Sequence, residues 1–146
     1  MKNILKQSGF SVSISKNMES WQKSHVAMVA PLGKVIYYDG GNNYTVANNK
    51  KAIHQMILEL KENFIFLKRS GIEIEPFKLK IFLFLPMFIL NPLMRFVYRT
   101  KWEENLISNH ALNAKQEMDK ISNDFLKLAD LHGYNLVEFK RLSNLP

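Results

Sequence analysis

The stretch from Met18 to Tyr38 constrains the fold more than any other part of the chain, because it is apolar or small on nearly every side. On a helix of 3.6 residues per turn, one face gathers its larger apolar and aromatic side chains, and the opposite face carries mostly small or apolar ones. A helix without a polar side is usually buried, so we expect a central helix. Asn17 is expected to cap its N-terminus, and the Asp39-Gly40-Gly41 turn is expected to end it. The predicted apolar face consists of Trp21, His25, Met28, Val29, Leu32, Val35 and Ile36.

Pro31 lies in the middle of this predicted helix. Proline has no backbone N–H, so the carbonyl of Ala27, four residues earlier, loses its normal helical partner. The sequence therefore predicts a kink at this point.

Composition limits the classes of protein that this chain can belong to. Its 146 residues are enough for one domain with a real core, and it has no cysteine, which excludes disulfides and thiolate sites. The net charge of +7 is spread in ones and twos along the chain and interleaved with acids, so we expect a solvated surface and no nucleic-acid partner. The first residues lack the apolar core and cleavage site of a secretory signal, and a cytoplasmic location is expected.

The rest of the chain indicates further helices joined by loops. Residues 4–14 alternate like a short strand, and 40–49 are rich in Gly and Asn, which predicts a surface loop. Asn49 can cap a helix that runs to about Ser70 and ends at Gly71. Residues 72–76 should form an extended linker.

Phe77 to Tyr98 is the most apolar run of the chain. Lysines precede it, Pro86 and Pro92 interrupt it and Arg95 follows, so its uninterrupted part is too short to span a bilayer. We expect two short helices broken at the prolines, with an apolar patch left over for a partner. No membrane is among the expected partners, although association with a membrane surface through this run and its flanking cations stays open as an alternative.

Residues after Lys101 repeat apolar side chains at spacings of three and four, which predicts helices over 101–112 and 114–132. Asn113 and Gln116 have the spacing of a capping box, and Gly133 should end the second helix. A last helical turn is predicted around 138–142. The fold class is therefore all-α. The seam of the 114–132 helix and the residues before it consists of Ala111, Ala114, Met118, Ile121, Phe125 and Leu128.

No self-contained catalytic motif occurs in the sequence. It lacks GxSxG, HExxH and any pair of histidines four residues apart, so no metal site is expected. The four histidines are isolated from one another, and for His25 and His110 a hydrogen-bonded position in the core is the expectation.

Several short motifs follow one another in an order that resembles the C-terminal helical domain of the ketopantoate reductase family. That domain has the 6-phosphogluconate-dehydrogenase C-terminal-like fold, and the resemblance extends over essentially the whole chain. The motifs are Trp21-x-Lys23, Pro31-Leu32, Glu117-x-Asp119-x-Ile121, His132-Gly133, Glu138 and Arg141-Leu142.

The resemblance implies roles for three residues. The lysine that matches Lys23 is the acid that protonates the ketone oxygen during hydride transfer, and the glutamate that matches Glu117 hydrogen-bonds the substrate. Asn105 stands where the family has a substrate-binding serine. Two substrate-positioning asparagines of the family are replaced here by Ala27 and Pro31.

The family also has an N-terminal Rossmann domain that binds NADPH, whereas this chain lacks the glycine fingerprint of such a domain. The resemblance therefore implies a substrate-binding and dimerising domain of a reductase of 2-oxo acids, bound to no cofactor of its own and inactive alone. Residues 1–16 are then expected to be the remnant of the linkage to the cofactor domain, and 1–146 a single helical domain. The alternative is a stand-alone helical module for dimerisation or interaction, without catalysis.

Overall fold

The computed structural model describes residues 17–101, 104 and 109–143. Those residues form helices, turns and loops, which confirms the all-α class; the predicted strand at 4–14 lies outside them. The elements are α2 (Met18–Tyr38), α3 (Asn43–Asn48), α4 (Lys50–Arg69), the 3₁₀ turn η1 (Phe77–Lys80), α5 (Ile81–Phe84), α6 (Met87–Val97), α8 (Asn109–Asn113), α9 (Lys115–Leu131) and α10 (Val137–Ser143).

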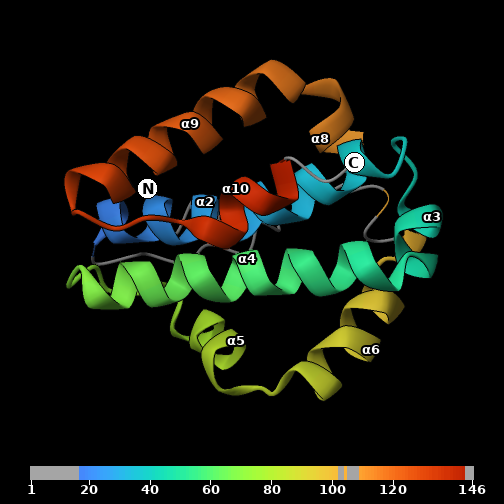
Figure 1. Cartoon of the computed structure of the whole chain (residues 1–146), viewed down its shortest axis with the longest axis horizontal. Coiled ribbons are helices and arrows are strands. Elements are labelled where there is room, and N and C mark those ends of the chain that lie inside the picture. The colour runs from blue at the N-terminus through green and yellow to red at the C-terminus, as the bar shows by residue number, and fades with distance from the viewer. Residues whose placement is uncertain (1–16, 102–103, 105–108, 144–146) are drawn as a thin grey trace, which may run out of the picture.

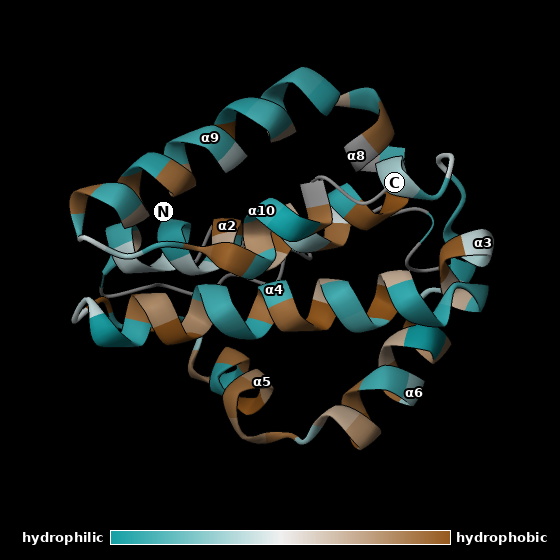
Figure 2. Ribbon diagram, in the orientation of Figure 1, coloured by the Kyte–Doolittle hydropathy of each residue, from teal (hydrophilic) through white to brown (hydrophobic). Residues whose placement is uncertain are grey.

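Helices α2 and α4 form the centre of the molecule, where they pack against each other along their lengths (Figure 1). Helices α9 and α10 cover one side of this pair, and α5 and α6 form a separate lobe on the other side of α4. Figure 2 shows brown, hydrophobic ribbon over most of that lobe and alternating colours on α4 and α9. The core therefore lies around α2 and α4, as expected of a helix with no polar side.

Helix α2 begins and ends as predicted, although the face it buries was only partly predicted. The Asn17 side chain accepts from the Ser20 N–H at 3.1 Å, and the helix ends before Gly40 and Gly41, which both have positive φ. Its N-terminal half buries a stripe of small side chains, while the predicted Trp21 is half-buried and His25 is exposed. Small residues let α4 and the 72–76 segment approach closely, which apolar periodicity alone does not reveal. The buried residues of α2 are Ser20, Ser24, Ala27, Ala30, Pro31, Leu32, Gly33, Val35 and Ile36.

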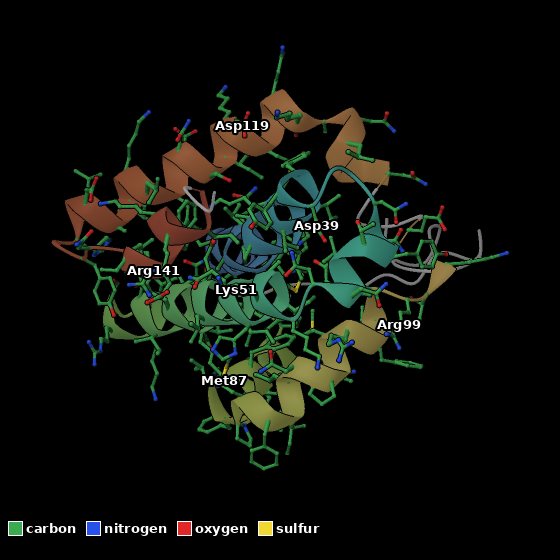
Figure 3. All side chains as sticks on the ribbon, turned by 45° about the vertical axis from the view of Figure 1, so that its right-hand side comes forward. Asp39, Lys51, Met87, Arg99, Asp119 and Arg141 are labelled. Carbon is green, nitrogen blue, oxygen red and sulfur yellow. The ribbon has the colours of Figure 1, made fainter. Side chains whose placement is uncertain are left out.

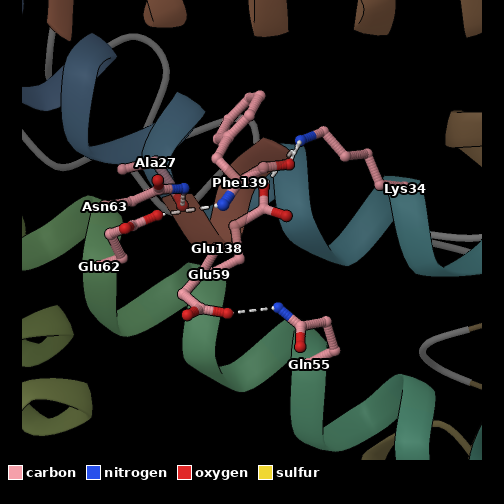
Figure 4. Close-up of polar contacts among 8 residues, drawn as sticks. All are labelled: Ala27, Lys34, Gln55, Glu59, Glu62, Asn63, Glu138 and Phe139. Carbon is pink, nitrogen blue, oxygen red and sulfur yellow. Dashed lines mark hydrogen bonds and ion pairs between the residues drawn. The ribbon is translucent and has the colours of Figure 1, made fainter. Parts of the chain in front are cut away.

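Helix α2 continues through Pro31, and α4 replaces the hydrogen bond that the proline removes. The amide Nδ2 of Asn63 on α4 donates to the Ala27 carbonyl at 3.0 Å, and Asn63 is fully buried (Figure 4). This is the carbonyl that has no i+4 N–H partner, because residue 31 is proline. The two central helices are thus joined at the point where the proline interrupts the helical hydrogen bonds.

The prediction of a loop over 40–49 is wrong, because α3 lies within it. The Asn42 side chain accepts from the N–H groups of Tyr44 and Thr45, which is N-capping. Asn43 is buried and donates to the Tyr98 carbonyl at 2.9 Å, so this short helix is tied to the end of α6. The asparagines that suggested a loop are a helix cap and a tertiary contact.

Helix α4 is confirmed, with Asn49 as its N-cap and Gly71 just after its end. The apolar run is divided at Pro86 as predicted, but Pro92 lies within α6 and does not break it. Among the described residues, no helix is long and apolar enough to cross a membrane.

Helices α9 and α10 complete the core. The predicted seam of α9 is confirmed in part, because Met118 and Phe125 are buried but Ile121 and Leu128 are half-buried. The predicted capping box is wrong, because Ala114 and not Asn113 is the N-cap residue of α9. The N-terminus of α10 is capped by Glu62 of α4, whose carboxylate accepts from the Val137 N–H at 2.8 Å and the Phe139 N–H at 3.0 Å. This cap joins segments far apart in the sequence.

Candidate functional site

Lys23 lies at a groove between the N-terminal half of α2 and the middle of α9. About a quarter of its side chain is exposed, and its ammonium contacts the Glu19 carboxylate one turn earlier. That contact lowers the pKa of Glu19, so Glu19 keeps its negative charge beside the ammonium. The groove has a volume of about 200 Å³ and is lined by Gln22, Lys23, Val26, Ile121, Asp124, Phe125 and Leu128.

This groove combines a mainly apolar wall with a few polar groups at its rim. The apolar side chains come from both helices, and the polar groups are the ammonium of Lys23, the amide of Gln22 and the carboxylate of Asp124. Ligand sites have this composition, although enclosed ones are usually larger than about 300 Å³. The groove is therefore suited to hold one side of a small polar molecule.

The other two predicted site residues do not line this groove. Glu117 is exposed in the first turn of α9, on the same helical side as Ile121 and Asp124 but seven residues before Asp124, which is about 10 Å along the axis. Asn105 lies outside the described residues. Among residues brought near Lys23 from α9, Asp124 is the carboxylate that sequence reasoning missed.

The two positions where the related family has asparagines, Ala27 and Pro31, are buried between α2 and its neighbours. Side chains there face the core, and Ala27 contributes its carbonyl to the contact with Asn63. In this chain, polar groups at these positions would lie in the helix–helix packing, which gives a structural reason for their absence.

The prediction of a core position for His25 is wrong, since it is exposed and stacks on the Trp21 ring at 5.0 Å between centroids. The side chain of His110 lies outside the described residues. Within the described part of the chain, no group of three or more His, Asp or Glu side chains could hold a metal ion.

A buried ion pair between Lys34 on α2 and Glu59 on α4 is the main polar feature that the sequence did not predict. Lys34 Nζ is 2.9 Å from Glu59 Oε1, donates to the Phe139 carbonyl at 3.3 Å and lies over the Phe139 ring (Figure 4). The Glu59 side chain is completely buried, and its Oε2 has no hydrogen-bond partner among the residues that the structure describes. The pair joins α2, α4 and α10.

Burial shifts both groups toward their neutral forms. It raises the pKa of Glu59 to about 8 despite the nearby Lys34 ammonium, and it lowers the pKa of Lys34 despite the attraction of Glu59. Lys34 keeps a carbonyl and an aromatic face as additional partners for its cation, whereas Glu59 has one unpaired oxygen. We therefore infer that Lys34 keeps its proton and that the Glu59 carboxylate takes up a proton and becomes neutral as pH falls.

Lys34 also borders a second, more polar hollow of about 550 Å³ between α2, α9 and α10. Its size is that of a small-molecule site, but Lys34 is already paired within the core. A signal for this pair exists in the sequence: Glu59, like Asn63, interrupts the mainly apolar face of α4, and a charge there needs a partner. The hollow is lined by Lys34, Tyr37, Tyr38, Lys115, Asp119, Ser122, Asn123, Leu126, Phe139 and Leu142.

Comparison of the chain with protein-family models, with curated proteins and with solved structures found no match.

Proposed function

We propose that this chain is the substrate-side helical domain of an NAD(P)H-dependent reductase of 2-oxo acids, with Lys23 as the proton donor. The cofactor would be held by a separate nucleotide-binding unit that closes over the groove between α2 and α9. The observation that carries the proposal is the place of Lys23: a half-buried ammonium at the rim of a mainly apolar groove, beside a carboxylate and an amide.

The shape of the groove supports a site divided between two units. Its volume of about 200 Å³ is below that of an enclosed ligand site, and it is open to solvent on the side away from the core. A covering unit would exclude water from it and would strengthen the electrostatic effect of the Lys23 ammonium on a bound carbonyl. The order of short motifs along the sequence, which resembles that of the ketopantoate reductase family, points to the same arrangement.

The groove residues suit the chemistry of ketone reduction. When bound, a reduced nicotinamide supplies the hydride that attacks the ketone carbon, and the ketone oxygen then needs one proton. The Lys23 ammonium can donate that proton and interacts favourably with the developing negative charge on the oxygen. Glu19 holds the ammonium in place through its hydrogen bond, so we assign Glu19 a positioning role.

Nuclear magnetic resonance of the full chain tests the proposal. Titration with a branched 2-oxo acid should shift the amide signals of residues 22–26 and 121–128, and Lys23→Ala should weaken this binding about tenfold by removing a charge-assisted contact. Lys51→Ala, an exposed lysine on α4 that lines a different hollow, is the matched control and should leave the affinity unchanged. The assignment of this groove would be refuted if Lys23→Ala left the affinity unchanged, or if the amide signals shifted only in another part of the chain.

The alternative function, a helical dimerisation or interaction module without catalysis, is favoured by a different observation. Several large apolar side chains of α5 and α6 are exposed to solvent, more than a monomer needs. The predicted homodimer would place such a surface between two copies. Light scattering of the purified chain distinguishes the cases, and a monomer at high micromolar concentration would exclude the dimer.

A further inference from the structure

The lobe formed by η1, α5 and α6 exposes an apolar surface that the fold does not use. Four phenylalanines are largely exposed: Phe77 and Phe84 by 76%, Phe88 by 77% and Phe96 by 68%. We call this surface the lobe face, and it comprises Phe77, Ile81, Phe84, Phe88, Ile89, Leu93 and Phe96.

Helix α6 already has a complete contact with the core on its other side. Leu90 and Met94 are buried there, and Phe82 of α5 stacks on Phe64 of α4 at 6.2 Å between ring centroids. The lobe is therefore anchored by one set of apolar side chains and exposes a second set. Figure 2 shows brown ribbon over much of the lobe, interrupted by teal bands. A contiguous exposed apolar surface in a folded domain marks an interaction site.

The charged residues of the lobe segment itself are all basic, and the acidic Glu73, from the segment before it, lines a hollow with Lys80 and Phe84. Residues 76–101 contain Lys78, Lys80, Arg95, Arg99 and Lys101 and no acidic residue. The Lys80 ammonium lies over the Phe77 ring at 4.7 Å, at the edge of the apolar surface. Aromatic side chains bordered mainly by cations form the pattern of a surface that lies against anionic lipid.

A cationic hollow lies where the lobe joins the body. It has a volume of about 540 Å³ and brings two lysines of α4 beside Arg95 of α6. Figure 3 labels Lys51 on α4 and Met87, at the start of α6, in the lobe below it. Arg95 is held there by its Nε, which donates to the Ala47 carbonyl at 2.9 Å. The lining residues are Lys50, Lys51, His54, Asn91, Pro92 and Arg95.

Two lysines at the first positions of α4 are unfavourable for the helix itself, because the N-terminal end carries the positive end of the helix dipole. Their position is favourable if a negative group occupies the hollow. The α6 residues that line the hollow lie between Phe88 and Phe96 of the lobe face, so a bilayer against this face would bring lipid phosphates near the hollow.

We propose that the lobe face binds the surface of an anionic phospholipid bilayer, with the phenylalanines inserted and the cationic hollow against lipid phosphates. A second copy of the chain is less suited to the same face, because it would bring the same cations together without acidic partners from the segment. This inference is independent of the proposed reductase role, since the lobe and the Lys23 groove use different helices.

Vesicle co-sedimentation of the full chain tests the proposal. The chain should sediment with vesicles of phosphatidylcholine mixed with phosphatidylserine at low salt, much less with phosphatidylcholine alone, and less again at high salt because ions screen the cations. The double change Phe84→Ser and Phe88→Ser should lower the partition coefficient at least tenfold, and Lys51→Glu should lower it at least fivefold. All five substituted positions, including the two controls, are exposed, and circular dichroism verifies that each variant stays folded.

The controls are an exposed leucine and an exposed lysine elsewhere. Leu131→Ser changes a side chain that is 85% exposed at the end of α9, and Lys127→Glu reverses a charge on α9. Both should leave sedimentation within twofold of the unmodified chain. Absence of sedimentation, or equal losses in the control variants, would overturn the proposal. A stable dimer in light scattering that dissociates on Phe88→Ser, without vesicle binding, would assign the lobe face to a second copy instead.

Discussion

The contact between Asn63 and the Ala27 carbonyl predicts a measurable coupling between Asn63 and Pro31. In the unmodified chain the carbonyl depends on Asn63 Nδ2, 3.0 Å away, because Pro31 offers no N–H. Asn63→Ala leaves that carbonyl buried and without this partner, a loss of about 1–3 kcal/mol of stability. Within the described part of the chain the Asn63 Oδ1 atom has no hydrogen-bond partner, so its removal recovers part of the cost. We expect a net loss of about 2 kcal/mol.

The same change should cost less when residue 31 can donate. In a Pro31→Ala background the new N–H can bond the Ala27 carbonyl, so Asn63→Ala should then cost about 1 kcal/mol or less. The double-mutant cycle should therefore give a coupling of about 1–2 kcal/mol. For a chain of this size, the loss of about 2 kcal/mol expected for Asn63→Ala corresponds to a decrease of about 4–8 °C in Tm.

Urea unfolding followed by circular dichroism measures all corners of this cycle. Pro92→Ala is the matched control, since Pro92 also lies inside a helix but Asn63 bonds no carbonyl there. Its effect should add to that of Asn63→Ala within about 0.5 kcal/mol. If Pro31→Ala and Asn63→Ala were also additive, the idea that Asn63 replaces the missing helical bond would be wrong.

Three other changes test the remaining polar contacts and one turn. The pKa of Glu59 in the folded chain is raised to about 8, so between about pH 4.5 and pH 8 the native state holds a proton that the unfolded chain has released. The free energy of unfolding should therefore fall by up to ~1.4 kcal/mol per pH unit as pH rises through this range. Glu59→Gln should abolish this slope in urea titrations at several pH values, and an unchanged slope would contradict the assignment. Glu62→Ala should destabilise the chain by about 1–2 kcal/mol and speed amide hydrogen exchange in α10, whereas uniform exchange changes would argue against a capping role. Gly41→Ala should cost about 1 kcal/mol or more in the same unfolding assay, because φ is +85° and an added Cβ would lie 3.2 Å from Leu112; a neutral result would rule out this strain.

Local signals in the sequence were sufficient for much of the fold. Asparagines cap the N-termini of α2 and α4, and glycines follow their C-terminal ends. Both signals act on backbone groups within a few residues, so both helices were predicted with their ends. The spacing of apolar side chains likewise predicted α9, and proline at 86 predicted the division of the apolar run. The candidate lysine of the groove, Lys23, was found from short motifs, and its proposed role is still a prediction.

Contacts between distant segments decided the rest. Composition indicated a loop at 40–49, but tertiary contacts such as that of Asn43 with the end of α6 accompany a short helix there. The partners of Lys34 and Glu62 come from segments far away in the chain, and no local pattern specifies them. The sequence by itself determined where most helices form, because capping and periodicity act over a few residues. Only the tertiary structure decided which polar groups are buried together and which apolar surface of the lobe stays exposed, because both depend on how the helices pack.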